Sequence, residues 1–188
     1  MERKRIEIEA KFPLLNIDET INILKKVGKK TEESIRQIDT YYTPAHINFI
    51  EQKPIVKWLR VRKTDDENTI NFKDWSNNSR EKKIKCKEIE VGVDDYKGIK
   101  EILKSLDFTE IIVVDKTRTS FLYKDIIFSI DKIKDLGNFI ELEYKNNIFE
   151  DEDESLKYIL SILNELNISV GEQIFAGYPQ LIMKKGTK

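Results

Sequence analysis

Short stretches of the chain alternate apolar and charged residues with a period of two. In Ile6–Phe12 the apolar side chains occupy the even positions, and Glu7, Glu9 and Lys11 occupy the odd positions between them. Such alternation predicts a β-strand with one apolar and one charged face. The same pattern returns in Leu59–Arg62, Ile70–Lys73, Glu88–Val91, Lys116–Arg118, Ser129–Asp131 and Phe139–Tyr144. We therefore expect several antiparallel strands, each with a charged face.

Three other segments have the helical period of 3.6 residues. They are Asp18–Lys26, Asp95–Leu106 and Glu154–Leu166, and acidic residues precede or open each one, as is typical of helix N-termini. The polar or turn-rich stretches Thr43–Pro54 and Ser76–Ser79 are predicted to be loops, and neither is long enough to separate domains. The 188 residues are thus expected to form a single α+β domain, residues 1–188.

A weak internal repeat divides this domain. The motif Glu7-x-Glu9 is followed by a helical segment and several strand-like segments. The same order begins again 81 positions later, at Glu88-x-Glu90. The repeat predicts two similar halves that close one barrel.

The charged strand faces could be exposed to solvent on an open sheet. Alternatively, they could line the inside of a closed barrel whose apolar exterior is covered by helices. The distribution of charge favours the barrel. Arg60 with Arg62, and Glu141 with Glu143, place two like charges on one strand face. Like charges at a protein surface repel by up to about 4 kcal/mol at 4 Å before screening. Such doublets indicate a ligand site.

Composition excludes some ligand classes. The chain has 33 Lys and Arg residues and 34 Asp and Glu residues, a net charge of -1, so no overall positive field is available for nucleic acid or a membrane surface. Neither is expected as a partner. The single cysteine, Cys86, and the lack of an apolar signal core suggest a cytoplasmic protein. The only histidine, His46, lies in a predicted loop, so we expect it at the surface and not in a catalytic triad.

The charged faces bring together two sets of side chains with complementary chemistry. The cations are Lys11, Arg60, Arg62, Lys73, Lys116 and Arg118; the carboxylates are Glu7, Glu9, Glu88, Glu90, Asp131, Glu141 and Glu143. Arginine and lysine bind phosphate oxygens, and carboxylates are hard oxygen ligands for Mg²⁺ or Mn²⁺. A triphosphate with a divalent metal needs both sets.

These residues resemble a known family. Glu7–Lys11 matches the ExExK signature of CYTH proteins, also called triphosphate tunnel metalloenzymes. The match continues in order through Asp39–Tyr42, Leu59–Arg62, Lys73, Glu88-x-Glu90, Lys116-x-Arg118, Asp131, Leu136–Glu143 and Gly177–Ile182, and so covers nearly the whole chain. The strand from Leu136 to Glu143 and the C-terminal segment look more like the class IV adenylyl cyclase branch. Cys86, where a basic residue is frequent, and Gly177, where Ser is frequent, depart from the family pattern.

The resemblance implies an eight-stranded antiparallel tunnel and roles for particular residues. Those expected to bind the triphosphate are Lys11, Arg60, Arg62, Lys73, Lys116 and Arg118, with Lys11, Arg118 and Asp131 closest to catalysis. Those expected to hold Mg²⁺ or Mn²⁺ are Glu7, Glu9, Glu141 and Glu143. Supporting roles fall to Glu88, Glu90, Asp39 and Tyr178, the last as part of a lid or as an anchor of the chain end.

Three functions remain open at this point. The first is a cyclase, monomeric or homodimeric, that converts ATP to cyclic AMP and pyrophosphate. The second is a triphosphatase for inorganic triphosphate, thiamine triphosphate or a nucleoside triphosphate. The third is a module that binds polyphosphate or nucleotide without turnover, which would predict missing metal ligands. Trp58 and Trp75 could stack on a nucleobase, but packing under a loop is the favoured interpretation.

Overall fold

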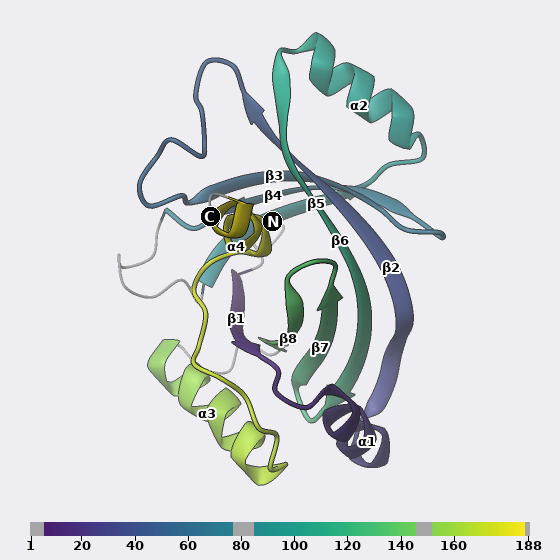
Figure 1. The fold of residues 1–188 in the computed structure, drawn as a ribbon, viewed down its shortest axis with the longest axis vertical. Helices are drawn as coiled ribbons and strands as arrows, with labels where there is room; N and C mark the ends of the chain where they lie inside the picture. The colour runs from purple at the N-terminus through teal and green to yellow at the C-terminus, as the bar shows by residue number, and fades with distance from the viewer. Residues whose placement is uncertain (1–5, 77–84, 146–151, 187–188) are drawn as a thin grey trace, which may run out of the picture. The chain divides into compact units, whose positions relative to one another are not determined.

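The chain is an α+β protein in which antiparallel strands predominate. The computed structural model describes residues 6–76, 85–145 and 152–186. Within these ranges the strands are β1 (Ile6–Pro13), β2 (Lys29–Pro44), β3 (Lys57–Lys63), β4 (Asn68–Asp74), β5 (Lys85–Gly92), β6 (Phe108–Tyr123), β7 (Ile126–Ile133) and β8 (Gly137–Tyr144). The helices are α1 (Ile17–Val27), α2 (Tyr96–Ser105), α3 (Glu152–Glu165) and α4 (Tyr178–Gly186). These elements, drawn in Figure 1, confirm the class expected from the alternation.

The chain divides into two compact units, each assembled from separate parts of the sequence. The first unit contains Met1–Ile6, Arg36–Asp115 and Ala176–Lys188, as far as they are described, and the second contains Glu7–Ile35 and Lys116–Phe175. Strands β2 and β6 are both 16 residues long, and each begins in one unit and ends in the other. Each unit therefore depends on strands that the other unit also uses.

The second unit is a four-stranded antiparallel sheet whose apolar face is covered by helices. β6 pairs with β7, β7 with β8, and β8 with β1. Alternate side chains of these strands form a core that includes Phe121, Phe128 and Leu142, and helices α1 and α3 add Leu24 and Ile159 to it. Because successive residues of a strand face opposite sides, this packing turns the intervening polar side chains to the other face.

The first unit repeats this arrangement with β2, β3, β4 and β5, paired in that order. Helix α2 packs on one face, where its Leu103 joins a core cluster with Tyr42 and Val61. The alternate residues of β3, Arg60 and Arg62, therefore lie on the opposite face.

A turn between β7 and β8 sets the register that positions polar groups in the second unit. Gly137 has a φ of +132°, a conformation that glycine adopts without steric cost. This backbone conformation explains why a glycine stands between Leu136 and Asn138. The turn pairs Ile133 with Gly137, and the same register places Ser129 opposite Glu141.

Most predicted elements are confirmed, and two elements were missed. The three predicted helices correspond to α1, α2 and α3 with ends that differ by at most two residues. The loop predicted over Thr43–Pro54 starts too early, because β2 continues through Pro44. Of the loop predicted at Ser76–Ser79, only Ser76 is among the described residues, and it lies in a turn. Strand β2, outside its Asp39–Tyr42 motif, and helix α4 were not predicted as regular structure.

No helix in the described ranges is long and apolar enough to cross a membrane.

The N-terminus of α2 offers a test of local stability. The Asp95 side chain accepts hydrogen bonds from the backbone N–H groups of Lys97 (3.0 Å) and Gly98 (2.9 Å). Asp95→Ala should lower the free energy of unfolding by about 1 kcal/mol, since two backbone donors lose their acceptor. Urea denaturation measures this loss. Asp94→Ala, at the exposed preceding residue, is the matched control and should change little; equal effects of both variants would contradict the capping role.

Candidate functional site

In the first unit, two arginines of β3 share one buried carboxylate of β2. Arg62 donates from Nε to Asp39 Oδ1 (2.7 Å) and from Nη2 to Asp39 Oδ2 (2.8 Å). Arg60 Nη1 lies 3.6 Å from the same Oδ2. The strand register pairs Asp39 directly with Arg62, which explains the two-bond geometry. Asp39 is fully buried, so it compensates both guanidinium groups away from bulk water.

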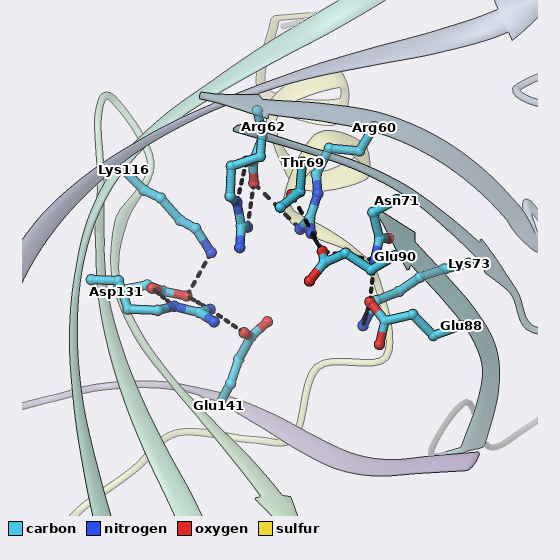
Figure 2. Close-up of polar contacts among 12 residues, drawn as sticks. Arg60, Arg62, Thr69, Asn71, Lys73, Glu88, Glu90, Lys116, Asp131 and Glu141 are labelled. Atoms are coloured by element: carbon cyan, nitrogen blue, oxygen red, sulfur yellow. Dashed lines mark hydrogen bonds and ion pairs between the residues drawn. The ribbon is translucent and has the colours of Figure 1, made fainter. Parts of the chain in front are cut away.

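A second group of contacts continues across β4 and β5, as Figure 2 shows. Arg60 Nη2 donates to Glu90 Oε2 (3.1 Å), and Lys73 Nζ lies 3.6 Å from Glu88 Oε1. The buried Asn71 lies between these pairs and donates to both carboxylates, to Glu90 Oε2 at 3.0 Å and to Glu88 at close range. The amide thus holds Glu88 and Glu90 next to the cations.

The neighbours of Arg60 shift its pKa. Burial would lower its pKa, but Asp39, Tyr41 and Glu90 act in the other direction, and together they raise the pKa above the ordinary arginine value. The guanidinium is therefore always charged. Its Nε is buried and has no hydrogen-bond partner among the described residues, so one of its donors is left for a ligand.

In the second unit, Asp131 of β7 occupies a position like that of Asp39. Arg118 Nε donates to Asp131 Oδ1 (2.7 Å) and Arg118 Nη2 to Oδ2 (2.5 Å), while Lys116 Nζ lies 3.3 Å from Oδ2. Arg118 also contacts Glu141 at close range, and Lys11 Nζ forms an ion pair with Glu141 Oε1 (3.0 Å). Figure 2 shows Lys116, Asp131 and Glu141 pointing toward one another from their strands.

The pKa of both carboxylates of this cluster is lowered by the neighbouring cations. Burial would raise the pKa of Asp131, but Arg118 and Lys116 outweigh burial and lower it. Burial likewise opposes ionisation of Glu141, yet Lys11, Arg118 and Lys116 hold the pKa of Glu141 well below its usual range. Each carboxylate is thus fixed as an anion by cations on neighbouring strands.

Carboxylates that could hold a divalent metal lie on β1 and β8. The register places Glu9 directly opposite Glu143, and like charges in this position are destabilising unless a cation lies between them. Lys145 Nζ bonds to Glu143 (2.9 Å), and Glu141 is held by Lys11 and Arg118. The structure does not describe the side chain of Glu7. Oxygen-only donors suit Mg²⁺ or Mn²⁺, although no group of three or more such ligands is assembled among the described residues.

The remaining candidate residues differ in burial. Tyr178 is buried at the start of α4, and Trp58 is buried with its ring edge-on to Tyr41, at 5.6 Å between centroids. Trp75 is also buried, whereas His46 is exposed, as predicted. Cys86 belongs to β5, but its side chain lies outside the described part.

Three polar groups were missed by the sequence analysis. Asn71 had a signal, because it alternates with Lys73 on the charged face of β4. Ser120, which donates to Glu32, and the buried Gln37 had none, since isolated polar residues of this kind are common on strands.

The chain belongs to the CYTH family. The CYTH domain model matches residues 5–178. A putative adenylate cyclase of Methanocaldococcus jannaschii is 31% identical, over 94% of this chain and 98% of that protein.

Solved structures share the fold. A Pyrococcus horikoshii protein superimposes with a TM-score of 0.78 at 26% identity, covering 95% of this chain and 99% of that one. A putative adenylyl cyclase of Hippeastrum, described by its dominant triphosphatase activity, gives a TM-score of 0.67 at 14% identity, covering 96% of this chain and 95% of that one. The latter likeness shows the shared fold alone.

The buried cluster around Asp131 predicts how stability depends on pH. A depressed folded-state pKa contributes stability that is present above the unfolded value, near pH 4 for Asp, and is lost as pH falls through the folded value. Asp131→Asn should therefore cost about 3–5 kcal/mol at pH 7, because Lys116 and Arg118 lose a buried partner. The difference from wild type should shrink below about pH 4, as measured by urea unfolding from pH 7 to pH 3.

Asp115→Asn is the matched control. Asp115 pairs with the exposed Arg36 (2.8 Å), so its loss should have a small effect with little pH dependence. If Asp131→Asn and Asp115→Asn behaved alike, Asp131 would not be the buried counter-charge described above.

Proposed function

We propose that this protein is a metal-dependent enzyme acting on a triphosphate, and specifically a class IV adenylyl cyclase that converts ATP to cyclic AMP and pyrophosphate. The observation that carries the proposal is the sharing of single buried carboxylates by pairs of cations, Asp39 by Arg60 and Arg62, and Asp131 by Lys116 and Arg118. The relationship to a putative adenylate cyclase of M. jannaschii supports the same reaction.

The shared carboxylates hold the cations ready for phosphate. Glu90 and Glu141 also contact Arg60 and Arg118, so phosphate oxygens would exchange with these glutamates while Asp39 and Asp131 stay in place. Arginine binds phosphate oxygens through paired donors. Because Asp39 and Asp131 fix the side chains before the ligand arrives, little conformational entropy is lost on binding. The proposed triphosphate ligands are Lys11, Arg60, Arg62, Lys73, Lys116 and Arg118.

A closed eight-stranded tunnel is part of the proposal. It is supported by the charged strand face in each unit and by β2 and β6, which contribute to both units. Such closure would make residues 1–188 one CYTH domain and remove bulk water from around the phosphates, which strengthens every charge interaction there.

Glu7, Glu9, Glu141 and Glu143 are the proposed metal ligands. A bound Mg²⁺ or Mn²⁺ would supply positive charge that neutralises phosphate oxygens. When a triphosphate engages Lys11 and Arg118, these cations can exchange Glu141 for phosphate oxygens, and Glu141 then becomes free to act as a ligand.

The proposed cyclisation depends more on the orientation of the reacting atoms than on a strong general acid or base. The 3′-oxygen of the ribose would form a bond to the α-phosphorus as the bond to the bridging oxygen breaks, so pyrophosphate leaves with the electron pair and the hydroxyl proton passes to solvent. Lys11 and Arg118 would stabilise the charge that develops on the leaving group. Asp131 would position Lys116 and Arg118, because its lowered pKa makes it a poor proton acceptor.

A triphosphatase is the second candidate. The same cations and carboxylates would serve attack of water on a terminal phosphorus, and the activity named for the Hippeastrum protein favours keeping this alternative. Inorganic triphosphate, thiamine triphosphate and nucleoside triphosphates are its candidate substrates. A module that binds without turnover is less well supported, since the sequence retains all four proposed metal ligands.

The proposal is tested by incubating the protein with ATP, or with inorganic triphosphate, in the presence of Mg²⁺ or Mn²⁺. Products are separated by chromatography. Cyclic AMP with pyrophosphate is expected. Orthophosphate without cyclic AMP would identify a triphosphatase. No turnover of either compound would refute the proposal that the protein is an enzyme.

In the same assay Arg62→Met should lower kcat/KM by about 10²-fold or more, because a cation of the proposed phosphate site is removed. Arg36→Met, a change of an exposed arginine on the neighbouring β2, is the control and should retain wild-type activity. Wild-type activity of Arg62→Met would remove Arg62 from the substrate site.

The metal assignment predicts a separate effect of Glu143→Gln. The variant should raise the half-saturating Mg²⁺ or Mn²⁺ concentration at least about tenfold, as measured by activity against metal concentration. Glu165→Gln, at an exposed glutamate that pairs with Lys124, should not change it. An unchanged metal requirement in Glu143→Gln would exclude Glu143 as a ligand.

A further inference from the structure

Arg60 uses its guanidinium group differently from the two other arginines of the candidate site. Arg62 and Arg118 each place Nε and Nη2, the donors on one edge of the planar group, on the two oxygens of a buried aspartate. In Arg60 the same edge is half used. Its Nη2 donates to Glu90 Oε2 (3.1 Å), but its buried Nε has no hydrogen-bond partner among the described residues. The edge that binds a pair of oxygens is thus incomplete in Arg60.

The two carboxylates that contact Arg60 are held with different strength. The side chain of Asp39 is 2% exposed and also accepts two hydrogen bonds from Arg62, so its departure would leave buried cations without their partner. The side chain of Glu90 is 45% exposed, and ion pairs with an exposed member contribute little to stability. Glu90 is therefore the carboxylate that a stronger anion can displace from Arg60.

Asn71 provides a second partner for Glu90. Its Nδ2 donates to Glu90 Oε2 (3.0 Å) and, at close range, to Glu88, as Figure 2 shows. Ionised carboxylates only accept hydrogen bonds, so the amide must turn its two N–H groups toward them. When Arg60 releases Glu90, this glutamate keeps the hydrogen bond from Asn71 and gains water. Glu90 thus stays beside the site and can return when a ligand leaves.

A phosphate group completes what Glu90 leaves open. Two oxygens of one phosphate match the Nε and Nη2 donors of an arginine in paired, charge-assisted bonds. Glu90 satisfies only Nη2. A phosphate on this edge would therefore replace one hydrogen bond by two, and it would pair a buried donor that lacks a partner in the described part of the free protein.

We propose that Glu90 is a placeholder anion, which occupies the phosphate position of Arg60 in the free protein and is displaced from the Nε–Nη2 edge by the triphosphate. The inference rests on the proposed function and gives Glu90 a role beyond that of a counter-charge. It predicts that Glu90 acts in opposite directions on two quantities. Glu90 stabilises the free protein, because it compensates Arg60, and it weakens binding of the ligand, because it competes for the same donors.

The test measures the Kd of inorganic triphosphate by calorimetry in the presence of EDTA, so that binding reports the cations without a divalent metal. Glu90→Gln keeps the size and one acceptor oxygen but removes the charge, and it should lower Kd about 3- to 10-fold. Glu90→Ala, which also removes the acceptor, should lower Kd at least as much. Glu101→Gln, at an exposed glutamate of α2, makes the same change in net charge and should leave Kd unchanged.

Two further measurements separate competition from structural damage. Without ligand, the melting temperature of Glu90→Ala should lie below that of wild type, although this variant binds triphosphate more tightly. Damage to the site would instead lower both stability and affinity. Arg60→Lys keeps the positive charge but removes the planar edge, and it should raise Kd at least about tenfold.

The outcomes distinguish this inference from the proposed function. A Kd that is unchanged or higher in both Glu90 variants would show that Glu90 does not compete, and equal tightening in Glu90→Gln and Glu101→Gln would show a general effect of charge. A wild-type Kd in Arg60→Lys would show that the edge does not bind phosphate. Each of these results overturns the inference while the enzyme stands. If neither wild type nor any variant bound triphosphate, with EDTA or with Mg²⁺, the proposed function would be overturned instead.

Discussion

The cost of burying cations on strand faces governs this structure. Lys116 and Asp131 are both almost completely buried, and neither could remain charged there alone, since an unpaired buried charge is strongly destabilising. The solution is the same in each unit. A carboxylate on one strand, Asp39 or Asp131, faces two cations that alternate on the next strand, and the antiparallel register sets the carboxylate directly opposite the arginine, Arg62 or Arg118.

The shared buried carboxylates do not balance the cations alone, and Glu88, Glu90 and Glu141 supply further counter-charge. These glutamates stabilise the free protein, and a phosphate bound by the same cations would have to displace them. Sharing one buried anion between two cations fixes their geometry, so electrostatic preorganisation and folding stability depend on the same contacts.

Much of the fold and the identity of the charged residues could be predicted from the sequence, because period-two alternation and like-charged doublets are local signals. The charged face of β3 is an example. Which anion meets which cation could not be predicted, since Asp39 and Arg62 are brought together only by register. The expectation that Arg60 and Arg62 repel one another was incomplete for the same reason: their common partner lies on another strand.

The missed elements have equally specific physical causes. The first half of β2, Lys29–Arg36, is almost entirely polar and exposed, so no apolar alternation marks it. Helix α4 has only nine residues, with Pro179 in its first turn, and too few turns to establish a helical period.

Gln37 illustrates a further kind of information that sequence patterns do not hold. A single glutamine on a strand carries no signal, and the structure is needed to show that its buried amide oxygen has no hydrogen-bond partner in the described part of the chain. Sites evolve under selection for ligand binding, so groups that are poorly satisfied in the free protein are the ones that a ligand completes. On this argument the Nε of Arg60, which has no hydrogen-bond partner among the described residues, marks a ligand position more closely than the ion pairs do, because the cations of those pairs already have carboxylate partners in the free protein.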